Sequence, residues 1–108
     1  MWIFLSDAML SIVQKPGDAE AGTLTVRARV AGDIERVFPD AKGIEGAGTD
    51  YRYRATVPRA QVAQAMHDHV MALDYSNFKG SVKDRPRHDA YLRVWQAMFS
   101  FQEQQRRD

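Results

Sequence analysis

Two segments in which apolar and polar side chains alternate strictly place the strongest constraint on how this chain folds. Residues 23–30 read TLTVRARV, and residues 51–57 read YRYRATV. Successive side chains of a strand point to opposite faces, so each segment has an apolar face and a face that carries two arginines. Such strands are typical of an antiparallel sheet that covers a core with one face only. On this interpretation Tyr51 and Tyr53 point to the core.

Other patterns predict the elements that complete the sheet. Residues 2–5 and 10–13 are apolar around a turn at residues 6–8, which predicts a short hairpin. Residues 15–22 (KPGDAEAG) indicate an exposed loop. Residues 43–48 (GIEGAG) indicate a loop with a short edge piece.

Three helices are expected, one short and two longer. Gly32 or Asp33 opens the short helix, Asp33 is a good N-cap, and Pro39 ends the helix. Pro58 suits the first turn of a longer helix over residues 59–73. The chain from 74 to 82 is expected to be an ordered connection.

The last helix is expected to begin after Asp84, a suitable N-cap. Its apolar residues recur at helical spacing and predict a buried stripe. That stripe consists of Tyr91, Leu92, Trp95, Met98 and Phe99. Residues 102–108 are polar and are expected to be a frayed tail.

Strands that come first and helices that follow favour an α+β fold. The 108 residues allow a single domain, spanning residues 1–108. We expect an antiparallel sheet of about four strands, with two longer helices and one short helix on one face. A ferredoxin-like arrangement is one version of this architecture, and the strand order is not readable from the sequence.

Charge and cysteine content exclude several classes of protein. The chain has 15 basic and 14 acidic residues and a net charge of +1, unlike a globally basic nucleic-acid binder. It has no cysteine, which excludes a disulfide scaffold, a thiol nucleophile and a thiolate metal site. The apolar N-terminus lacks a basic opening and carries Asp7, unlike a signal peptide. We therefore expect a cytoplasmic protein with no membrane contact and no cofactor.

A series of segments resembles a known family. MWIF and LSIV come first, LTVRAR leads to GDIERVFPDA, GTDYRYRATVPR follows, and LDYSNFKGSV precedes RHDAYLRVWQAM. Together they resemble a widespread bacterial family of small uncharacterised proteins over nearly the whole chain. The resemblance implies a single-domain bacterial cytosolic protein and implies no particular activity.

The histidines offer two candidate sites. His67 and His69 form an HDH motif, but on a helix their side chains point about 200° apart, so no metal site is expected. His88 is the better candidate, because a histidine followed by an acid, Asp89, can act as a general base. Asp89 would equally complement the helix dipole, and a half-buried structural His88 is the competing interpretation.

Asn77 and Lys79 belong to an irregular stretch (YSNFK) between two helices, where binding residues often lie. With His88 and Asp89 they would make a pocket-like site. A turn role for Asn77 and a core role for Phe78 explain the same residues without a ligand.

The strongest physical indication of function is a group of four arginines, Arg27, Arg29, Arg52 and Arg54. If their strands are neighbours, the four guanidiniums share the sheet face opposite the helices, where like charges repel. Such a face needs carboxylates, another subunit or an anionic partner. No stacking aromatic residue is expected there, because Tyr51 and Tyr53 point to the core, and this makes nucleic acid an unlikely partner.

The apolar first strand predicts self-association. Ile3 and Leu5 alternate with Trp2 and Phe4. If both faces of the strand are therefore apolar, the second face needs a cover beyond the sheet, and a second copy is the simplest one. Cover by the last helix or by a loop is the alternative.

The sequence therefore predicts a non-enzymatic binding module, a homodimer, whose arginine-bearing sheet face contacts an acidic protein or another anionic partner. One alternative is a small enzyme with His88 as general base and with Asn77 or Lys79 holding an anionic substrate. Another alternative is an inhibitor or accessory protein that docks on a larger complex.

Overall fold

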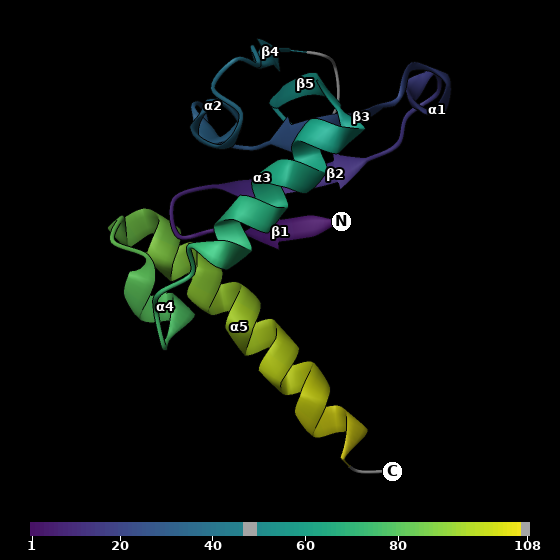
Figure 1. Cartoon of the computed structure of the whole chain (residues 1–108). Helices are drawn as coiled ribbons and strands as arrows, with labels where there is room; N and C mark the ends of the chain where they lie inside the picture. Colours follow the sequence, from purple (N-terminus) through teal and green to yellow (C-terminus); the bar gives the residue numbers. More distant parts are fainter. Residues whose placement is uncertain (47–49, 107–108) are drawn as a thin grey trace. The chain divides into compact units, whose positions relative to one another are not determined.

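The computed structural model describes residues 1–46 and 50–106. The chain forms two compact units, Met1–Asp74 and Tyr75–Asp108, and each is considered by itself (Figure 1). Within the described residues the first unit holds a five-stranded sheet and three helices, and the second holds two helices.

The sheet is antiparallel throughout, in the order β1-β2-β3-β5-β4. Its strands are β1 Trp2–Phe4, β2 Met9–Val13, β3 Thr23–Ala28, β4 Ile44–Glu45 and β5 Tyr53–Pro58. The α+β fold and the N-terminal hairpin are confirmed. The edge strand β4 brings the sheet to five strands instead of about four. The element order also differs from the β-α-β-β-α-β order of a ferredoxin-like fold.

Strand register gathers the core on one face of the sheet. Val26 of β3 lies between Ile12 of β2 and Ala55 of β5, and Ala28 lies opposite Leu10. All five side chains are buried. The strict alternation along β3 is the reason, because it places every second residue on this face.

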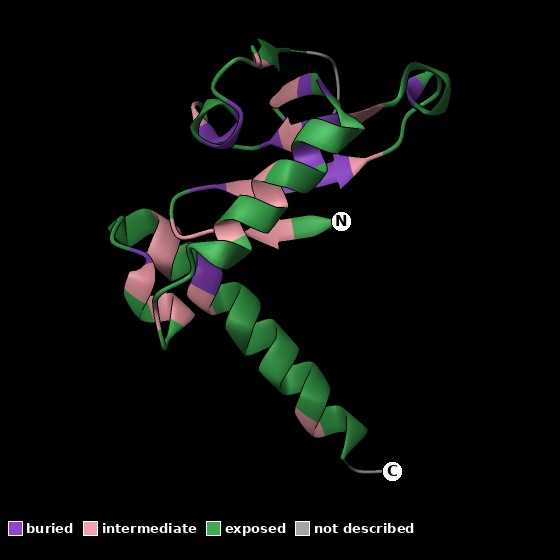
Figure 2. Cartoon of the chain, in the orientation of Figure 1, coloured by how far each residue is buried: buried purple, intermediate pink, exposed green. Residues whose placement is uncertain are grey.

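Two helices cover this face, α2 Asp33–Val37 and α3 Arg59–Met71. In Figure 2 buried residues appear on α2, on α3 and on the strands next to them, and a further one appears on α1. From α2 and its end, Ile34 and Phe38 enter the core, and α3 contributes Val62. Phe38 is 1% exposed, and burial of a side chain of this size stabilises a fold by about 1.5–3 kcal/mol.

The start of α2 differs in detail from the sequence-based expectation. Gly32 is the N-cap, with φ of 91°, and Asp33 lies within the first turn. The buried carboxylate of Asp33 accepts hydrogen bonds from the Met9 backbone N–H (3.0 Å) and the Arg36 guanidinium (2.7 Å). Asp33 therefore links α2 to strand β2.

Residues 15–22 are not the plain loop expected from their glycine, proline and acidic content. They contain a one-turn helix, α1 Asp18–Ala21, flanked by Gly17 (φ 92°) and Gly22 (φ 71°). Both glycines adopt the left-handed conformation that other residues rarely adopt. The sequence did not predict this helix because Gly17 and Gly22, which indicate turns, lie at its two ends.

Asp18 anchors α1 to the sheet face opposite the core. Its carboxylate accepts hydrogen bonds from the hydroxyls of Thr23 (2.6 Å) and Thr25 (2.9 Å) and from the Lys15 backbone N–H (2.7 Å). The Thr23 hydroxyl, the Lys15 amide, the Thr25 hydroxyl and the positive charge of Arg59 lower the pKa of Asp18 below its ordinary value of 3.8, against an opposing effect of burial.

This lowered pKa predicts an acid-dependent contribution of Asp18 to stability. A carboxyl with a lowered folded-state pKa stabilises the fold above its unfolded pKa and loses that contribution as the pH falls through the folded value. Asp18→Asn is therefore expected to destabilise the protein at pH 7 and to have less effect below pH 3.8. Urea denaturation across pH measures this. Glu20→Gln, an exposed change in the same helix, is the control. An Asp18→Asn effect independent of pH would contradict the assignment.

The second unit consists of α4 Phe78–Ser81 and α5 Arg85–Gln105. As expected, Asp84 caps α5, and its carboxylate accepts from the Arg87 backbone N–H at 3.1 Å. The unit is held together by aromatic side chains, since the ring of Phe78 stacks on that of Tyr91 (5.7 Å between centroids). Residues 102–105, expected to fray, are helical, and residues 107–108 of that tail lie outside the described residues.

The predicted buried stripe of α5 is only partly buried. Tyr91 is buried and Leu92 half-buried, whereas Trp95, Met98 and Phe99 are 47%, 59% and 46% exposed. The four-residue helix α4 is too short to cover the 21 residues of α5. No described helix combines the length and the hydrophobicity that a membrane span requires.

Candidate functional site

The register of β3 and β5 places Arg27 directly opposite Arg54. Both side chains lie on the face opposite the core, because Val26 and Ala55, their chain neighbours, pair within the core. In an antiparallel pair, side chains opposite each other have Cβ atoms about 5 Å apart. The condition for a shared arginine face, that the two arginine-bearing strands are neighbours, is therefore met for this pair.

Arg29 joins these two through Tyr51. The guanidinium carbons of Arg27 and Arg29 lie 4.5 Å and 4.0 Å from the centre of the Tyr51 ring. The ring is 4% exposed, so it serves as a buried support between the two guanidiniums. We call Arg27, Arg29, Arg54 and Tyr51 the arginine face.

The expectation that Tyr51 points into the helix-covered core is wrong. Strand β5 begins at Tyr53, and the chain bends at residues 50–52, so the alternation does not extend to Tyr51. Tyr53 does pack against the core cluster, as expected. Tyr51 lies two residues before the strand and continues its alternation, so the sequence alone does not distinguish it from a strand residue. Its contacts with the two guanidiniums reveal its role.

Neutral groups surround two of the guanidiniums. Arg27 donates to the Ser11 hydroxyl (2.6 Å), and Arg29 donates to the Asp50 carbonyl (3.2 Å). Among the described residues no carboxylate pairs with either arginine. The Nε–H of Arg27 is buried and makes no hydrogen bond within that part of the chain. These cations therefore keep their positive charge available on the sheet surface.

Arg52 is separate from this cluster. It precedes β5, is exposed, and its carbonyl accepts a hydrogen bond from Gly46 N–H (3.2 Å). Three of the four arginines expected on this face are therefore linked. Arg27 pairs with Arg54 across the strands, and Arg27 and Arg29 both contact Tyr51.

The second expected site divides into local structural roles. Asn77 caps α4 by accepting from Gly80 N–H (3.3 Å), and the Lys79 ammonium lies over the Trp95 ring (4.4 Å). His88 contacts the neighbouring carboxylate of Asp89 at 3.3 Å. His88 and Asp89 thus contact each other, whereas Asn77 and Lys79 each contact a different group.

The histidines of α3 have separate partners. His67 contacts the carboxylate of Asp68 (3.2 Å), and His69 contacts the Ala65 carbonyl (3.2 Å). Across the described residues no three histidine or acidic side chains come together as a metal site.

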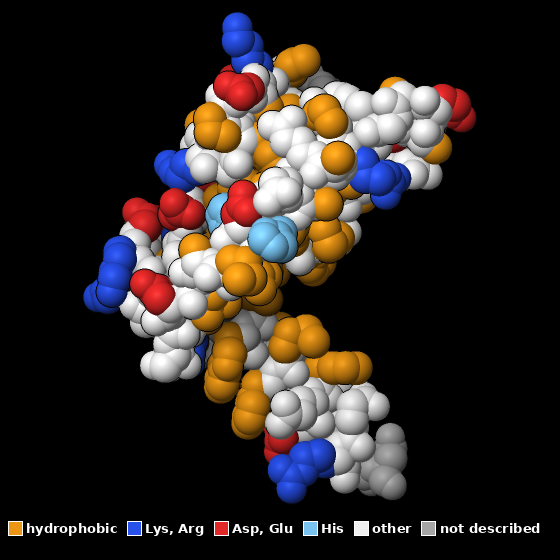
Figure 3. Space-filling model, in the orientation of Figure 1, with side chains coloured by type: hydrophobic (Ala, Val, Ile, Leu, Met, Phe, Trp, Pro, Cys, Tyr) orange, Lys and Arg blue, Asp and Glu red, His pale blue; other side chains and the backbone are white. Residues whose placement is uncertain are grey.

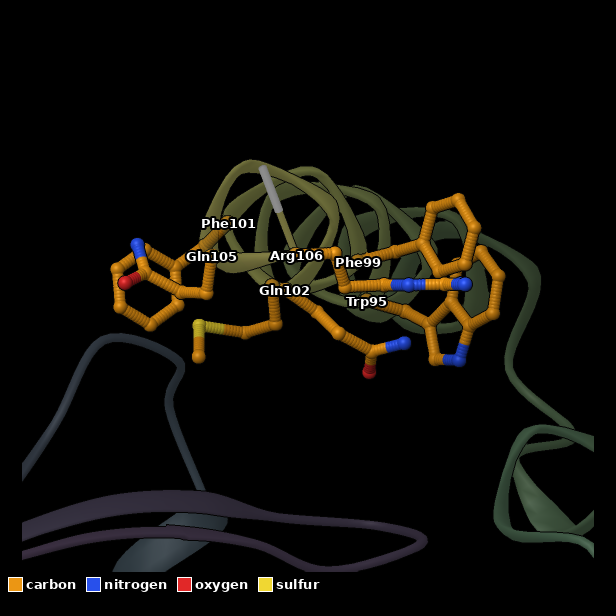
Figure 4. Close-up of a pocket in the computed structure, with 7 residues that line it drawn as sticks. Trp95, Phe99, Phe101, Gln102, Gln105 and Arg106 are labelled. Carbon is orange, nitrogen blue, oxygen red and sulfur yellow. The ribbon is translucent and has the colours of Figure 1, made fainter. Parts of the chain in front are cut away.

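An open groove of about 630 Å³ lies along α5 and includes none of the predicted site residues. In Figure 4, Trp95 and Phe99 lie on one side of the helix and Phe101 and Gln105 on the other. The rings of Trp95 and Phe99 stack at 5.3 Å. Figure 3 shows hydrophobic side chains gathered along this helix. The groove is apolar and carries no group suited to acid–base chemistry.

Comparison with family models, curated proteins and solved structures finds no match to this chain.

The support that Tyr51 gives the arginine face predicts a stability effect. Tyr51→Ala removes a buried ring from between two guanidiniums, and truncation of a buried aromatic side chain costs about 3 kcal/mol. Tyr51→Phe keeps the ring and is expected to cost about 1 kcal/mol or less. Urea denaturation of both variants checks this. Equal losses for the two variants would assign the effect to the hydroxyl and not to the ring.

Proposed function

We propose that this protein is a non-enzymatic binding module of the cytoplasm whose arginine face contacts an anionic partner. The direct opposition of Arg27 and Arg54 carries the proposal. Like charges opposite each other destabilise a strand pair, and a bound anion would convert this repulsion into attraction. Guanidinium forks suit phosphate and carboxylate groups in particular.

The local arrangement supports binding rather than catalysis. The Tyr51 ring holds the guanidiniums of Arg27 and Arg29, which lowers the entropy that each arginine loses on binding. The enzymatic alternative rests on the His88–Asp89 contact alone, since Asn77 and Lys79 are engaged elsewhere. An inhibitor or accessory protein would use the same arginine face against an acidic partner.

Salt-dependent retention on immobilised heparin, a polyanion without bases, tests the arginine face. The double variant Arg27→Gln, Arg29→Gln is expected to elute at clearly lower salt than the wild type. With two cations removed, fewer counterions are released from the polyanion on binding. Arg85→Gln with Arg93→Gln removes the same charge from exposed positions of α5 and is expected to elute close to the wild type. An equal shift for both double variants would show that net charge alone controls retention.

We also propose that the protein self-associates through α5 rather than through its first strand. Ile3 and Leu5 pack partly against their own core, so these two side chains give no reason for a dimer at that strand. On α5, by contrast, several large apolar side chains are at least 40% exposed. They are Val94, Trp95, Met98, Phe99 and Phe101.

The size of this apolar stripe indicates a weak dimer. Three half-exposed aromatic side chains of 150–250 Å² each leave roughly 300 Å² of apolar surface per copy. A pair of copies would bury roughly 600 Å² through these rings, which is below the roughly 1,200 Å² at which stable specific interfaces begin, so only weak association is expected.

Light scattering over a concentration series tests this dimer. The wild type is expected to gain mass with concentration. Met98→Glu is expected to remain monomeric because it places a charge in the stripe while keeping a good helix former. Ser100→Glu, at an exposed position of α5 on the side away from the stripe, is the control. A wild type that is monomeric at every concentration would contradict self-association through α5.

A further inference from the structure

One transverse row of the sheet combines the arginines with exposed apolar side chains. The register pairs Trp2 with Ser11, Ser11 with Arg27, Arg27 with Arg54, and Arg54 with Ile44. Partners opposite each other share a face, and the hydrogen bond between Arg27 and Ser11 confirms it for that pair. Adjacent strands lie about 4.8 Å apart, so the row is about 19 Å long.

The two ends of this row are open to solvent. Trp2 is 68% exposed and Ile44 is 66% exposed. Trp2 is not required for the core, because the alternation of β1 sends its neighbour Ile3 to the core face instead. The exposed Trp2 thus lies in one row with two arginines, and its backbone position is two strands, or about 10 Å, from that of Arg27.

This row matches the chemistry of a single nucleic-acid strand. Every base offers a flat face that stacks on an aromatic side chain, and every nucleotide carries one phosphate for a guanidinium. A duplex hides its base faces in the stack, whereas an unpaired strand exposes them. An acidic peptide would use the guanidiniums and leave the exposed indole without a function.

We propose that the arginine face, extended by Trp2, binds single-stranded nucleic acid, with a base stacked on Trp2 and neighbouring phosphates on Arg27 and Arg54. This inference rests on the proposed anion-binding function and names its ligand. The sequence-based argument against nucleic acid relied on the absence of aromatic side chains from this face. Trp2 overturns that premise, because its exposed indole lies on this face.

Asp18 limits the direction of the bound strand. Its carboxylate is bonded to Thr23 and Thr25 on this same face, one row of side chains away from Arg27. A phosphate is repelled there, so the strand is expected to follow the row from Trp2 toward Ile44 rather than to run along β3. With a net charge of only +1, binding depends on this local row and is expected to weaken steeply with salt.

Trp2 is itself the reporter of the proposed contact. The chain has two tryptophans, so Trp95→Phe leaves the fluorescence of Trp2 alone. In this background, titration with a six-nucleotide oligouridylate is expected to quench the indole emission to saturation. The anisotropy of the same oligonucleotide, labelled with fluorescein, measures the affinity independently.

Matched variants separate stacking from charge. Trp2→Ala is expected to weaken oligonucleotide binding about 5- to 100-fold, the range for loss of one base–aromatic stack. Trp2→Phe is expected to remain within a few-fold of the wild type. Both variants are expected to bind heparin unchanged, because the guanidiniums are intact. Arg93→Gln, on α5, is the charge control.

The outcomes distinguish this inference from the proposed function. Retention on heparin without saturable quenching of Trp2 overturns nucleic-acid binding and leaves the anionic partner standing. Binding of polyglutamate or of a duplex as tight as that of the oligonucleotide also overturns it. If the protein binds neither heparin nor the oligonucleotide, the proposed function itself is wrong.

Discussion

The antiparallel pairing of β3 with β5 is the constraint on which the rest of the structure depends. Six residue pairs fix this register, and burial of Val26 against Ala55 fixes which face meets the helices. A slip by one residue would move the entire apolar set to the opposite face. The same register necessarily brings Arg27 opposite Arg54. The core and the arginine face are therefore two consequences of one pairing, and the repulsion between the guanidiniums is tolerated because the core determines the register.

The polar face is organised by local contacts that prevent this repulsion from disordering it. The Tyr51 ring contacts the guanidiniums of both Arg27 and Arg29, and the Ser11 hydroxyl accepts a hydrogen bond from Arg27. Near the β2–β3 connection, Asp18 satisfies its carboxylate with threonine hydroxyls and a backbone amide instead of with the arginines. Acidic and basic groups thus occupy separate parts of the face. This separation leaves the guanidiniums of Arg27 and Arg29 without a carboxylate partner among the described residues.

Sequence reasoning succeeded where a single periodicity determines the outcome. Alternation predicted β3 and most of β5, and helical spacing with Asp84 as N-cap predicted α5. It failed where the result depends on a distant partner. The position of Tyr51 depends on a bend before β5, and the alignment of Trp2 with the arginines depends on three successive strand registers. Trp95 is exposed because α4, the other helix of its unit, is too short to cover most of α5. Periodicity cannot report any of these.

The central claim is that three arginines of the sheet bind an anion together. Nuclear magnetic resonance of the arginine side-chain Nε–H groups during titration with tripolyphosphate tests it most directly. The account predicts that the signals of Arg27, Arg29 and Arg54 shift with one common saturation point. The signal of Arg36, which is paired with Asp33, would remain in place. Uniform, unsaturated shifts of all the arginine signals would contradict the claim, because they would show only general screening of exposed charge.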